Sequence, residues 1–358
     1  MSVYRVIGLM SGTSLDGLDM ACCRLERNYS GWNYKISDAV TINYDDFMTE
    51  FLSDTKKYSG TELEQRNIFF GNFIGMEVIK FLKINGFKAD LLASHGHTIF
   101  HQPEKGITYQ LGDGRTIATV TGITTISDFR ILDIMNGGQG APLVPVGDEL
   151  LFAEFDYCLN LGGFSNISYR YNNSRVAFDI CPVNIFLNHV CRKIGKDYDN
   201  NGMLASRGSL ISILLDKLND LNYYHLRFPK SLSREWFETI FLPVVDKFDY
   251  PAEDILRTAC EHIAVQIAGV LGMKPGRRVL LSGGGVYNTF LIKLISEKTK
   301  AILETPDDKL IKFKEALVFA LLGVLKLRNE VNCYSSVTGA KYNSSCGTIY
   351  LPDQKRKG

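Results

Sequence analysis

The alternation of apolar and polar residues predicts a β-hairpin at the start of the chain and a similar one near its middle. Residues 3–10 are rich in β-forming side chains, a polar glycine-bearing turn follows, and the apolar pattern resumes at 18–25. The same plan of strand, glycine turn and strand returns over 157–171. Two similar hairpins, one in each half, indicate an internally duplicated architecture.

Helical spacing of apolar residues dominates the last third of the chain. It predicts a helix over 255–270 that Gly272 and Pro275 terminate. Residues 279–281 then predict a strand, which a glycine turn and a further helix follow. The stretch 313–327 is apolar nearly all round, which is typical of a helix buried between neighbours.

Composition limits the class of protein. A chain of 358 residues exceeds the usual size of one core, so we expect two domains or one large α/β unit. The densest cluster of glycine and proline, 136–145, places a domain boundary or hinge nearby. A net charge of +1 gives no global field that would recruit nucleic acid or an anionic membrane.

The N-terminal residues, the apolar stretches and the cysteines indicate the cellular location of the protein and the redox state of its thiols. The first ten residues lack the pattern of a secretory signal, and the apolar stretches fall short of the ~20 residues that span a bilayer. We therefore expect a cytoplasmic protein without a membrane anchor. Its eight cysteines include no C-x-x-C pair, which favours reduced, mostly buried thiols.

Three glycine turns are candidates for phosphate contacts. The turn from Ser11 to Asp19 holds three hydroxyls, two glycines and two carboxylates, more than a tight hairpin needs. It predicts a nucleotide or phosphate site, although a hairpin turn without ligand is the alternative. Gly162-Gly163 alone is weak evidence. The run 283–285 follows a strand but lacks the spacing of dinucleotide-binding folds.

Two further segments carry titratable groups. Histidines 95, 97 and 101 are close in sequence, as zinc ligands often are, but polar substrate contacts at a strand end are the favoured alternative. Asp179 ends a predicted strand before Pro182, where a carboxylate can act as a general base. A helix N-cap is an equally good interpretation of Asp179 from the residues alone.

Read together, these segments resemble the anhydro-N-acetylmuramic acid kinase family nearly end to end. The most specific element is the motif from Gly8 to Asp19, and order and spacing agree in the segments 95–98, 122–130, 137–145, 160–167, 282–288 and 337–340. The resemblance implies an α/β fold of two ribonuclease H-like domains of the actin and hexokinase ATPase superfamily, with ATP in the interdomain cleft. The domains expected are 1–130 and 131–336, with the C-terminal segment 337–358 packed on the first.

The reaction that the resemblance implies opens the anhydro bridge of 1,6-anhydro-N-acetylmuramic acid with water and moves the γ-phosphoryl group of ATP onto O6, in peptidoglycan recycling. Asp179 would be the base, and Asp16 would hold Mg²⁺, through water. Sugar contacts would come from His97, Thr98, Gln110, Arg130 and Glu315. ATP contacts would come from Gly12, Thr13, Ser14, Leu15, Asp16, Gly17, Leu18, Asp19, Gly162, Gly163, Gly283, Gly284, Gly285 and Asn288. A homodimer is left open.

One segment departs from the family. Where the family usually has Asp-Thr-Gly-Pro-Gly-Asn, this chain has isoleucine, Cys181 and Val183 in place of the threonine and both glycines. If those positions need a positive φ or a close phosphate, the new side chains would add strain and crowd the site. The alternatives are therefore a kinase of the same fold for another sugar, a nucleotide-binding homologue without catalysis and, more remotely, a metal-dependent hydrolase built on the histidines.

Overall fold

The computed structural model describes residues 2–12, 15–247 and 249–352. It divides into two compact units: unit 1 comprises Met1–Leu151 with Phe313–Gly358, and unit 2 comprises Phe152–Lys312. These boundaries differ from the expected ones at 130 and 336. The glycine- and proline-rich segment 136–145 lies inside unit 1, and the C-terminal part of unit 1 begins at Phe313 instead of at about 337.

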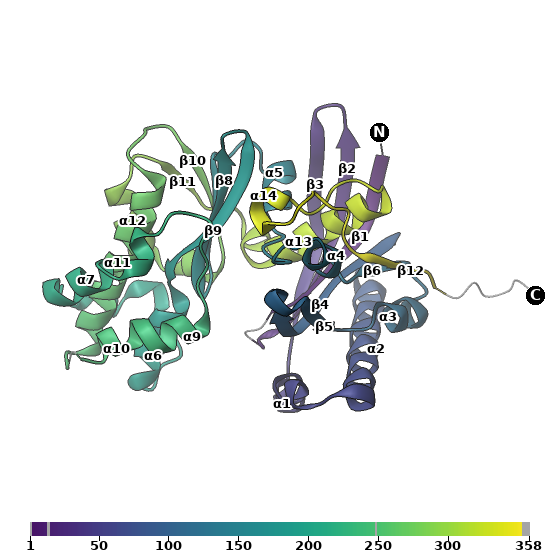
Figure 1. The fold of residues 1–358 in the computed structure, drawn as a ribbon, viewed down its shortest axis with the longest axis horizontal. Helices are drawn as coiled ribbons and strands as arrows, with labels where there is room; N and C mark the ends of the chain where they lie inside the picture. Colours follow the sequence, from purple (N-terminus) through teal and green to yellow (C-terminus); the bar gives the residue numbers. More distant parts are fainter. Residues whose placement is uncertain (1, 13–14, 248, 353–358) are drawn as a thin grey trace, which may run out of the picture. The chain divides into compact units, whose positions relative to one another are not determined.

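Unit 1 contains a mixed sheet with the strand order β12-β6-β4-β1-β2-β3, and β5 pairs with β4 (Figure 1). Strands β1 to β3 form an antiparallel meander, and β4 and β6 continue the sheet in parallel with β1. The strands are β1 (Ser2–Ser11), β2 (Gly17–Asn28), β3 (Gly31–Asn43), β4 (Leu91–Gln102), β5 (Ile107–Leu111), β6 (Thr125–Ser127) and β12 (Thr348–Tyr350).

Unit 2 repeats this plan with the strand order β11-β10-β7-β8-β9. Its first three strands are again an antiparallel meander, and β10 and β11 are parallel to β7. Both units therefore have the topology of a ribonuclease H-like domain, which confirms the expected fold and its duplication. The strands are β7 (Tyr157–Leu161), β8 (Phe164–Tyr171), β9 (Ser174–Pro182), β10 (Arg278–Ser282) and β11 (Ile302–Glu304).

The helices follow the same division. The helix predicted over 255–270 is present and ends where Gly272 adopts a φ of 70°. Helices of unit 1 are α1 (Asp46–Asp54), α2 (Gly60–Asn85), α3 (Gly114–Thr121), α4 (Ile131–Met135), α5 (Pro145–Leu151), α14 (Ser335–Thr338) and, from Phe313 on, α13 (Asp308–Leu327). Those of unit 2 are α6 (Asn184–Lys193), α7 (Ser212–Asn219), α8 (Asn222–His225), α9 (Arg234–Trp236), α10 (Leu242–Val245), α11 (Ala252–Leu271) and α12 (Thr289–Lys298).

The sheet of unit 1 is packed on both faces, and its first strand shows why. Ile7 and Leu9 are fully buried in a cluster that includes side chains of α2. Gly8 lies between them and faces the other side, because successive residues of a strand alternate. A Cβ at Gly8 would come within 1.8 Å of the carbonyl oxygen of Ala316 in α13. The glycine that opens the family motif therefore allows α13 to pack directly on β1.

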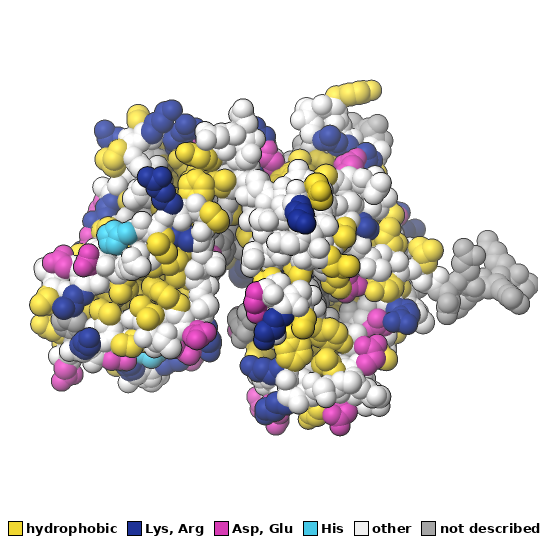
Figure 2. Space-filling view, viewed as in Figure 1, with side chains coloured by type: hydrophobic (Ala, Val, Ile, Leu, Met, Phe, Trp, Pro, Cys, Tyr) yellow, Lys and Arg dark blue, Asp and Glu magenta, His cyan; other side chains and the backbone are white. Residues whose placement is uncertain are grey.

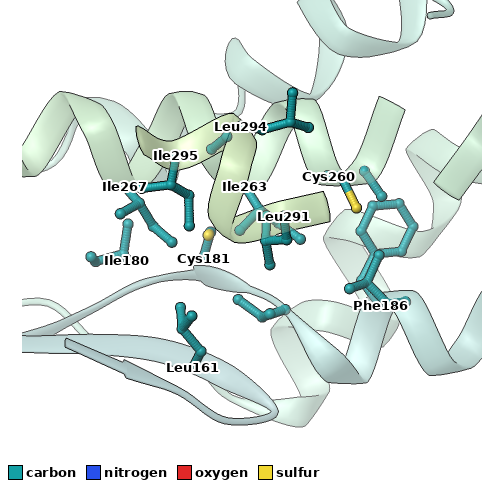
Figure 3. Packing of buried hydrophobic residues seen from close by; sticks show 14 of the residues in the cluster. Leu161, Ile180, Cys181, Phe186, Cys260, Ile263, Ile267, Leu291, Leu294 and Ile295 are labelled. Atoms are coloured by element: carbon teal, nitrogen blue, oxygen red, sulfur yellow. The ribbon is translucent and has the colours of Figure 1, made fainter. Parts of the chain in front are cut away.

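The core of unit 2 lies between its sheet and the helices α6, α11 and α12. Figure 3 shows Cys181 pointing from the sheet toward the helices that carry Ile263 and Leu291. All eight cysteines of the chain are buried free thiols, as expected from their spacing. This core holds β9, the strand that carries Asp179, against the rest of unit 2.

The surface agrees with the nearly balanced charge. On the face drawn in Figure 2, basic and acidic side chains are both present on each unit. None of the helices in the described residues is long and apolar enough to cross a membrane.

Candidate active site

The turn between β1 and β2 is the first candidate phosphate site. Thr13 and Ser14 lie outside the described residues. Leu15 has a φ of 63°, and its N–H donates to the carbonyl of Gly12 at 3.3 Å. Gly17 is buried, and a Cβ there would come within 2.5 Å of a carbonyl oxygen of β3, so a glycine is required for this packing.

The turn presents two carboxylates. Asp16 is exposed, whereas Asp19 is partly buried and accepts a hydrogen bond from the Thr41 hydroxyl at 2.5 Å. Burial raises the pKa of Asp19, the Thr41 hydrogen bond opposes this, and the nearby charge of Asp16 raises it further. The two carboxylates are therefore electrostatically coupled, which is a reason for a cation to bind beside them. Leu18 is buried and serves the core.

A magnesium ion that arrives with a nucleotide fits this turn. Mg²⁺ in phosphoryl-transfer sites usually takes one or two carboxylates, several waters and phosphate oxygens. Within the described ranges, no group of three or more His, Cys, Asp or Glu side chains is arranged to hold a metal by itself. Asp16, with Asp19 beside it, offers the smaller donor set that a magnesium–nucleotide complex needs.

His95 and His97 lie in the middle of β4 and bind protein groups. His95 is buried, its Nδ1 lies 2.9 Å from the Gly96 carbonyl, and its Nε2 lies 3.0 Å from Arg130 Nε and 2.8 Å from Arg130 Nη2. Burial, followed by the Arg130 charge, lowers the pKa of His95 well below its usual value. A neutral His95 that donates from Nδ1 and accepts at Nε2 satisfies this geometry. Both ring nitrogens are thus engaged, which removes support for the histidine metal site.

His97 is held as a second neutral imidazole. Its Nδ1 lies 2.9 Å from the Ser11 hydroxyl, which also accepts a hydrogen bond from Tyr44 at 2.7 Å. Burial lowers the pKa of His97 to about 4. Beside it, Thr98 of β4 pairs with Gln110 of β5, and the Gln110 amide nitrogen lies 3.4 Å from the Thr98 hydroxyl. Strand pairing therefore brings these three predicted sugar contacts together.

Arg130 and Glu315 complete the predicted sugar set in unit 1. Arg130 also donates to the Gly140 carbonyl at 2.7 Å, and burial lowers its pKa to about 10. Glu315 on α13 is exposed, but desolvation of its carboxylate raises its pKa. The charge of Arg130 opposes this shift, and the charge of Asp19 reinforces it. Electrostatic interactions thus connect the predicted sugar contacts to the carboxylates of the first turn.

The glycine turn of unit 2, Gly162-Gly163, differs from that of unit 1 because its carbonyls are hydrogen-bonded to the start of α6. The carbonyl of Gly163 accepts from Val183 N at 2.8 Å and from Ile185 N at 3.1 Å, and the carbonyl of Gly162 accepts from Asn184 N at 3.2 Å. These bonds satisfy the first amides of α6, which would otherwise lack partners. A Cβ on Gly163 would meet nothing within 4 Å.

The third glycine run packs directly on β7. Gly283 has a φ of 83°, and a Cβ there would lie 2.6 Å from the Asn160 side chain. Gly285 would similarly contact Leu161, whereas Gly284 has more space. Asn288 is buried, and its side chain caps α12 by accepting from Leu291 N at 3.0 Å. Packing and capping thus account for much of this motif, and its nucleotide contact stays a prediction.

Asp179 projects from β9 at an irregularity of the sheet. It pairs with Asn166, but Cys181 already pairs with Ser165, so Ile180 is an extra residue in β9. Such a bulge redirects side chains. It leaves Ile180 and Cys181 buried and Asp179 partly exposed. Asp179 does not cap α6, because that helix begins at Asn184 with Val183 as its N-cap residue.

The environment of Asp179 includes residues that the sequence analysis missed. Its Oδ2 accepts from Leu232 N at 2.8 Å, and its backbone carbonyl accepts from the Tyr223 hydroxyl at 2.6 Å. Burial raises the pKa of Asp179, and the Leu232 hydrogen bond lowers it. Tyr223 lies 44 residues from Asp179, and no local pattern links the two positions.

The departure from the family motif does not produce the expected strain. Val183 has a φ of −121°, and neither it nor Cys181 is among the described residues with positive φ. Both side chains are fully buried in the core of unit 2. The condition of a positive φ is therefore not met, and the bulge at Ile180 turns Cys181 inward, where a thiol packs as a small apolar group. Whether a phosphate approaches this backbone stays a prediction.

Comparisons with known proteins find relatives over nearly the whole length of the chain. Residues 4–352 match the family model described as anhydro-N-acetylmuramic acid kinase. A protein of that name from Legionella pneumophila (strain Paris) is 33% identical over 372 residues, which cover 98% of each chain. One from Photobacterium profundum is 34% identical over 98% of this chain and 99% of its own. Among solved structures, the activator of the 2-hydroxyisocaproyl-CoA dehydratase from Clostridium difficile has a TM-score of 0.45 at 14% identity, covering 90% of this chain and 96% of its own.

Proposed function

Because the chain belongs to the anhydro-N-acetylmuramic acid kinase family, we propose that it opens 1,6-anhydro-N-acetylmuramic acid with water and phosphorylates O6 from ATP. The protein is an ATP-dependent sugar kinase by family. The observation that carries the finer proposal is Asp179: a partly exposed carboxylate on a strand bulge, with one oxygen held by Leu232 N–H and a pKa raised by burial.

Asp179 has the properties of a general base for the hydrolytic half of the reaction. Leu232 N–H fixes Oδ2, so Oδ1 is the oxygen that takes a proton from water. The water oxygen then bonds to C1 of the sugar while the bond from C1 to O6 breaks. A raised pKa brings the carboxylate closer to the pH at which a base is both ionised and proton-accepting.

The phosphoryl half requires charge stabilisation. The released O6 attacks the γ-phosphorus, and ADP leaves. We assign the phosphates to the turn from Gly12 to Asp19 and to Gly162-Gly163, and the nucleoside to residues 283–285 with Asn288. Asp16 would hold Mg²⁺ through water, and the ion would neutralise charge on the phosphates. The exposed carboxylate of Asp16 and its coupling to Asp19 support this part.

We assign sugar recognition to polar and charged side chains of unit 1. A neutral His97 and His95-bound Arg130 can hydrogen-bond hydroxyl and carbonyl groups, and the exposed Glu315 can accept from a hydroxyl. Thr98 and Gln110 add adjacent polar groups on paired strands. Use of ATP and of a wall-derived sugar is consistent with a cytoplasmic location, which is part of the proposal.

The experiment is a product assay with purified protein, Mg-ATP and 1,6-anhydro-N-acetylmuramic acid in ¹⁸O-labelled water. We expect N-acetylmuramic acid 6-phosphate and ADP in equal amounts, with the label on C1 and none at O6. Phosphorylation of another sugar but not of the anhydro sugar would establish the same-fold alternative. ATP binding without turnover of any sugar would establish the non-catalytic homologue.

A further inference from the structure

Strand β9, which carries the proposed base, is the edge of its sheet. The segment 223–232 of unit 2 covers this edge and is called the covering segment below. Strand β9 ends the strand order, with β8 on one side. At Asp179 the backbone N–H donates to the Lys230 carbonyl at 3.3 Å, and the backbone carbonyl accepts from the Tyr223 hydroxyl at 2.6 Å. A side-chain hydroxyl thus takes the place of a strand partner, because buried backbone groups must be paired.

The covering segment also reaches the carboxylate. Leu232 N–H donates to Asp179 Oδ2 at 2.8 Å. The Lys230 ammonium donates to the Tyr223 carbonyl at 3.2 Å and lies 4.5 Å from the centre of the Tyr223 ring. Tyr223, Lys230 and Leu232 therefore form one connected support, with Tyr223 joined both to the backbone of Asp179 and to the residue that leads to Leu232.

We propose that Tyr223 is a positioning residue for the general base: its hydroxyl anchors the backbone of Asp179, while its carbonyl and ring hold Lys230, two residues before Leu232. Together these contacts keep Leu232 N–H on Oδ2, so that Oδ1 alone is presented to water. The inference rests on the proposed function, since it assigns Asp179 the role of base. Tyr223 acts through Asp179 and does not itself exchange a proton with the substrate.

The properties of Tyr223 suit this task. The side chain is 6% exposed, and its ring packs against Trp236 at 5.3 Å between ring centres, which restricts its rotation. Burial, followed by the charge of Asp179, raises the pKa of Tyr223. The hydroxyl therefore keeps the proton that it donates to the Asp179 carbonyl across the working pH range.

The support also affects the protonation of the base. The titratable groups packed around Asp179 are Tyr223 and Lys230 of the covering segment and Cys181 on its own strand. Because the Leu232 hydrogen bond lowers the pKa of Asp179, weakening it raises that pKa further. The acid limb of the kcat profile, which reports ionisation of the base, then moves to higher pH.

The test compares Tyr223→Phe with Tyr224→Phe, which is a matched control. Tyr224 is the next residue of α8, and its hydroxyl pairs with His262 Nε2 at 2.9 Å instead of with Asp179. We expect Tyr223→Phe to lower kcat roughly tenfold, to move its acid limb to higher pH and to leave the KM for ATP within about twofold. Tyr224→Phe should lower the melting temperature without moving the acid limb.

Two further measurements separate positioning from general stability. In an Asp179→Asn background, Tyr223→Phe should cost less than about twofold in the residual kcat, because both changes remove the same function. Amide hydrogen exchange at Asp179 and Leu232 should accelerate in Tyr223→Phe and not in Tyr224→Phe.

The outcomes distinguish this inference from the proposed function. If Asp179→Asn keeps full turnover of the anhydro sugar, both the base assignment and the positioning role are wrong. If Asp179→Asn is inactive while Tyr223→Phe and Tyr224→Phe have the same kcat, acid limb and exchange rates, the positioning role is wrong and the base assignment stands.

Discussion

The two units share one topology but differ in the turn between their first two strands. In unit 1 this turn spans five residues between Ser11 and Gly17 and ends in an exposed carboxylate, Asp16, with a coupled one at Asp19. In unit 2 the turn is Gly162-Gly163, and its carbonyls are bonded to the first amides of α6. A duplicated hairpin thus supplies a turn with an exposed carboxylate in one copy and a turn that is hydrogen-bonded to the start of a helix in the other.

The difference extends to the groups that surround each turn. Unit 1 places two neutral imidazoles on β4 and the partly buried Arg130 beside one of them. Unit 2 instead places the carboxylate of Asp179 on the third strand of the meander, held by the segment from Tyr223 to Leu232. The same fold therefore provides neutral hydrogen-bonding groups in one unit and a base in the other, and each assignment can be tested separately.

The largest effect is expected at the carboxylate of unit 2. Asp179→Asn keeps size and most hydrogen bonds but removes basicity, and we expect kcat to fall at least about a hundredfold. ATP and sugar affinities should stay within a few-fold, because Asp179 does not cap α6 and the amide can still accept from Leu232 N–H. The measurements are steady-state kinetics and ligand titration.

A matched control is Asp156→Asn, which removes a carboxylate of the same unit that is paired with Arg277 just before β7. This control should retain kcat. An Asp179→Asn protein that is destabilised but fully active would assign Asp179 a structural role.

The neutral state of His97 in unit 1 predicts a loss of stability in acid. Its folded pKa of about 4 lies below the usual 6.5, so the unfolded state binds the proton first. The contribution of His97 to the free energy of unfolding is therefore fully present above pH 6.5 and is lost as the pH falls toward 4. At pH 5 the loss is about 2 kcal/mol, and His97→Gln, which does not titrate, should avoid it.

Denaturant unfolding of both proteins at pH 7.5 and pH 5 measures this difference. The comparison between the two proteins cancels other titrating groups, His262 among them, whose pKa burial lowers to about 3. Equal losses of stability in both proteins would show that His97 is protonated in the folded state at pH 5.

The charged turn of unit 1 should respond to the loss of Asp16. We expect Asp16→Asn to raise the Mg²⁺ concentration for half-maximal activity roughly tenfold, because one carboxylate contact to a magnesium–nucleotide complex is lost. Asp46→Asn, which removes an exposed carboxylate at the start of α1 in the same unit, should leave it unchanged. If Asp16→Asn leaves the Mg²⁺ dependence of activity unchanged, a group other than Asp16 holds the ion.

Much of the fold is predictable because its signals are local. Strands β1 and β2, helix α11 and the buried α13 follow from apolar periodicity, and Gly272 ends α11 as a glycine in the left-handed region does. The site residues on the family motifs were also identifiable, since they lie in short, spaced sequences. The duplicated hairpin follows from the strand-forming residues on both sides of each glycine turn.

The unit boundary was not predictable from breaker residues. The chain enters unit 2 between Leu151 and Phe152, which are both buried, and leaves it within α13 at Phe313, where a non-helical backbone (φ −113°, ψ 16°) kinks the helix. By contrast, the segment 136–145 is tied into unit 1, where Gly140 N donates to Asp133 and Gln139 N donates to the Thr338 carbonyl. Gly138 and Gly140 of this segment are closely packed, because a Cβ at either position would come within 3 Å of a neighbouring side chain.

The residues that hold Asp179 could not be predicted from the sequence for a different reason. An edge strand needs partners for its outward backbone groups, but nothing in the β9 sequence indicates which segment supplies them. Likewise, the replacement of two family glycines could be judged only once the bulge at Ile180 was seen to turn Cys181 into the core. Long-range pairing determines both properties, and local spacing does not encode it.

The smallest effect is expected at the glycine turn of unit 2, with Gly163→Ala. A Cβ there would meet no atom within 4 Å, and Gly163 has no positive φ, so the fold should tolerate alanine with little change in melting temperature. If a phosphate approaches this backbone, the methyl group should raise the KM for ATP several-fold, by less than about 1 kcal/mol of binding, with kcat nearly unchanged. Gly269→Ala in α11, another open position of unit 2, is the control and should leave this KM unchanged. An unchanged KM in both variants would mean that no phosphate approaches this backbone and that the second turn serves the fold through its carbonyls.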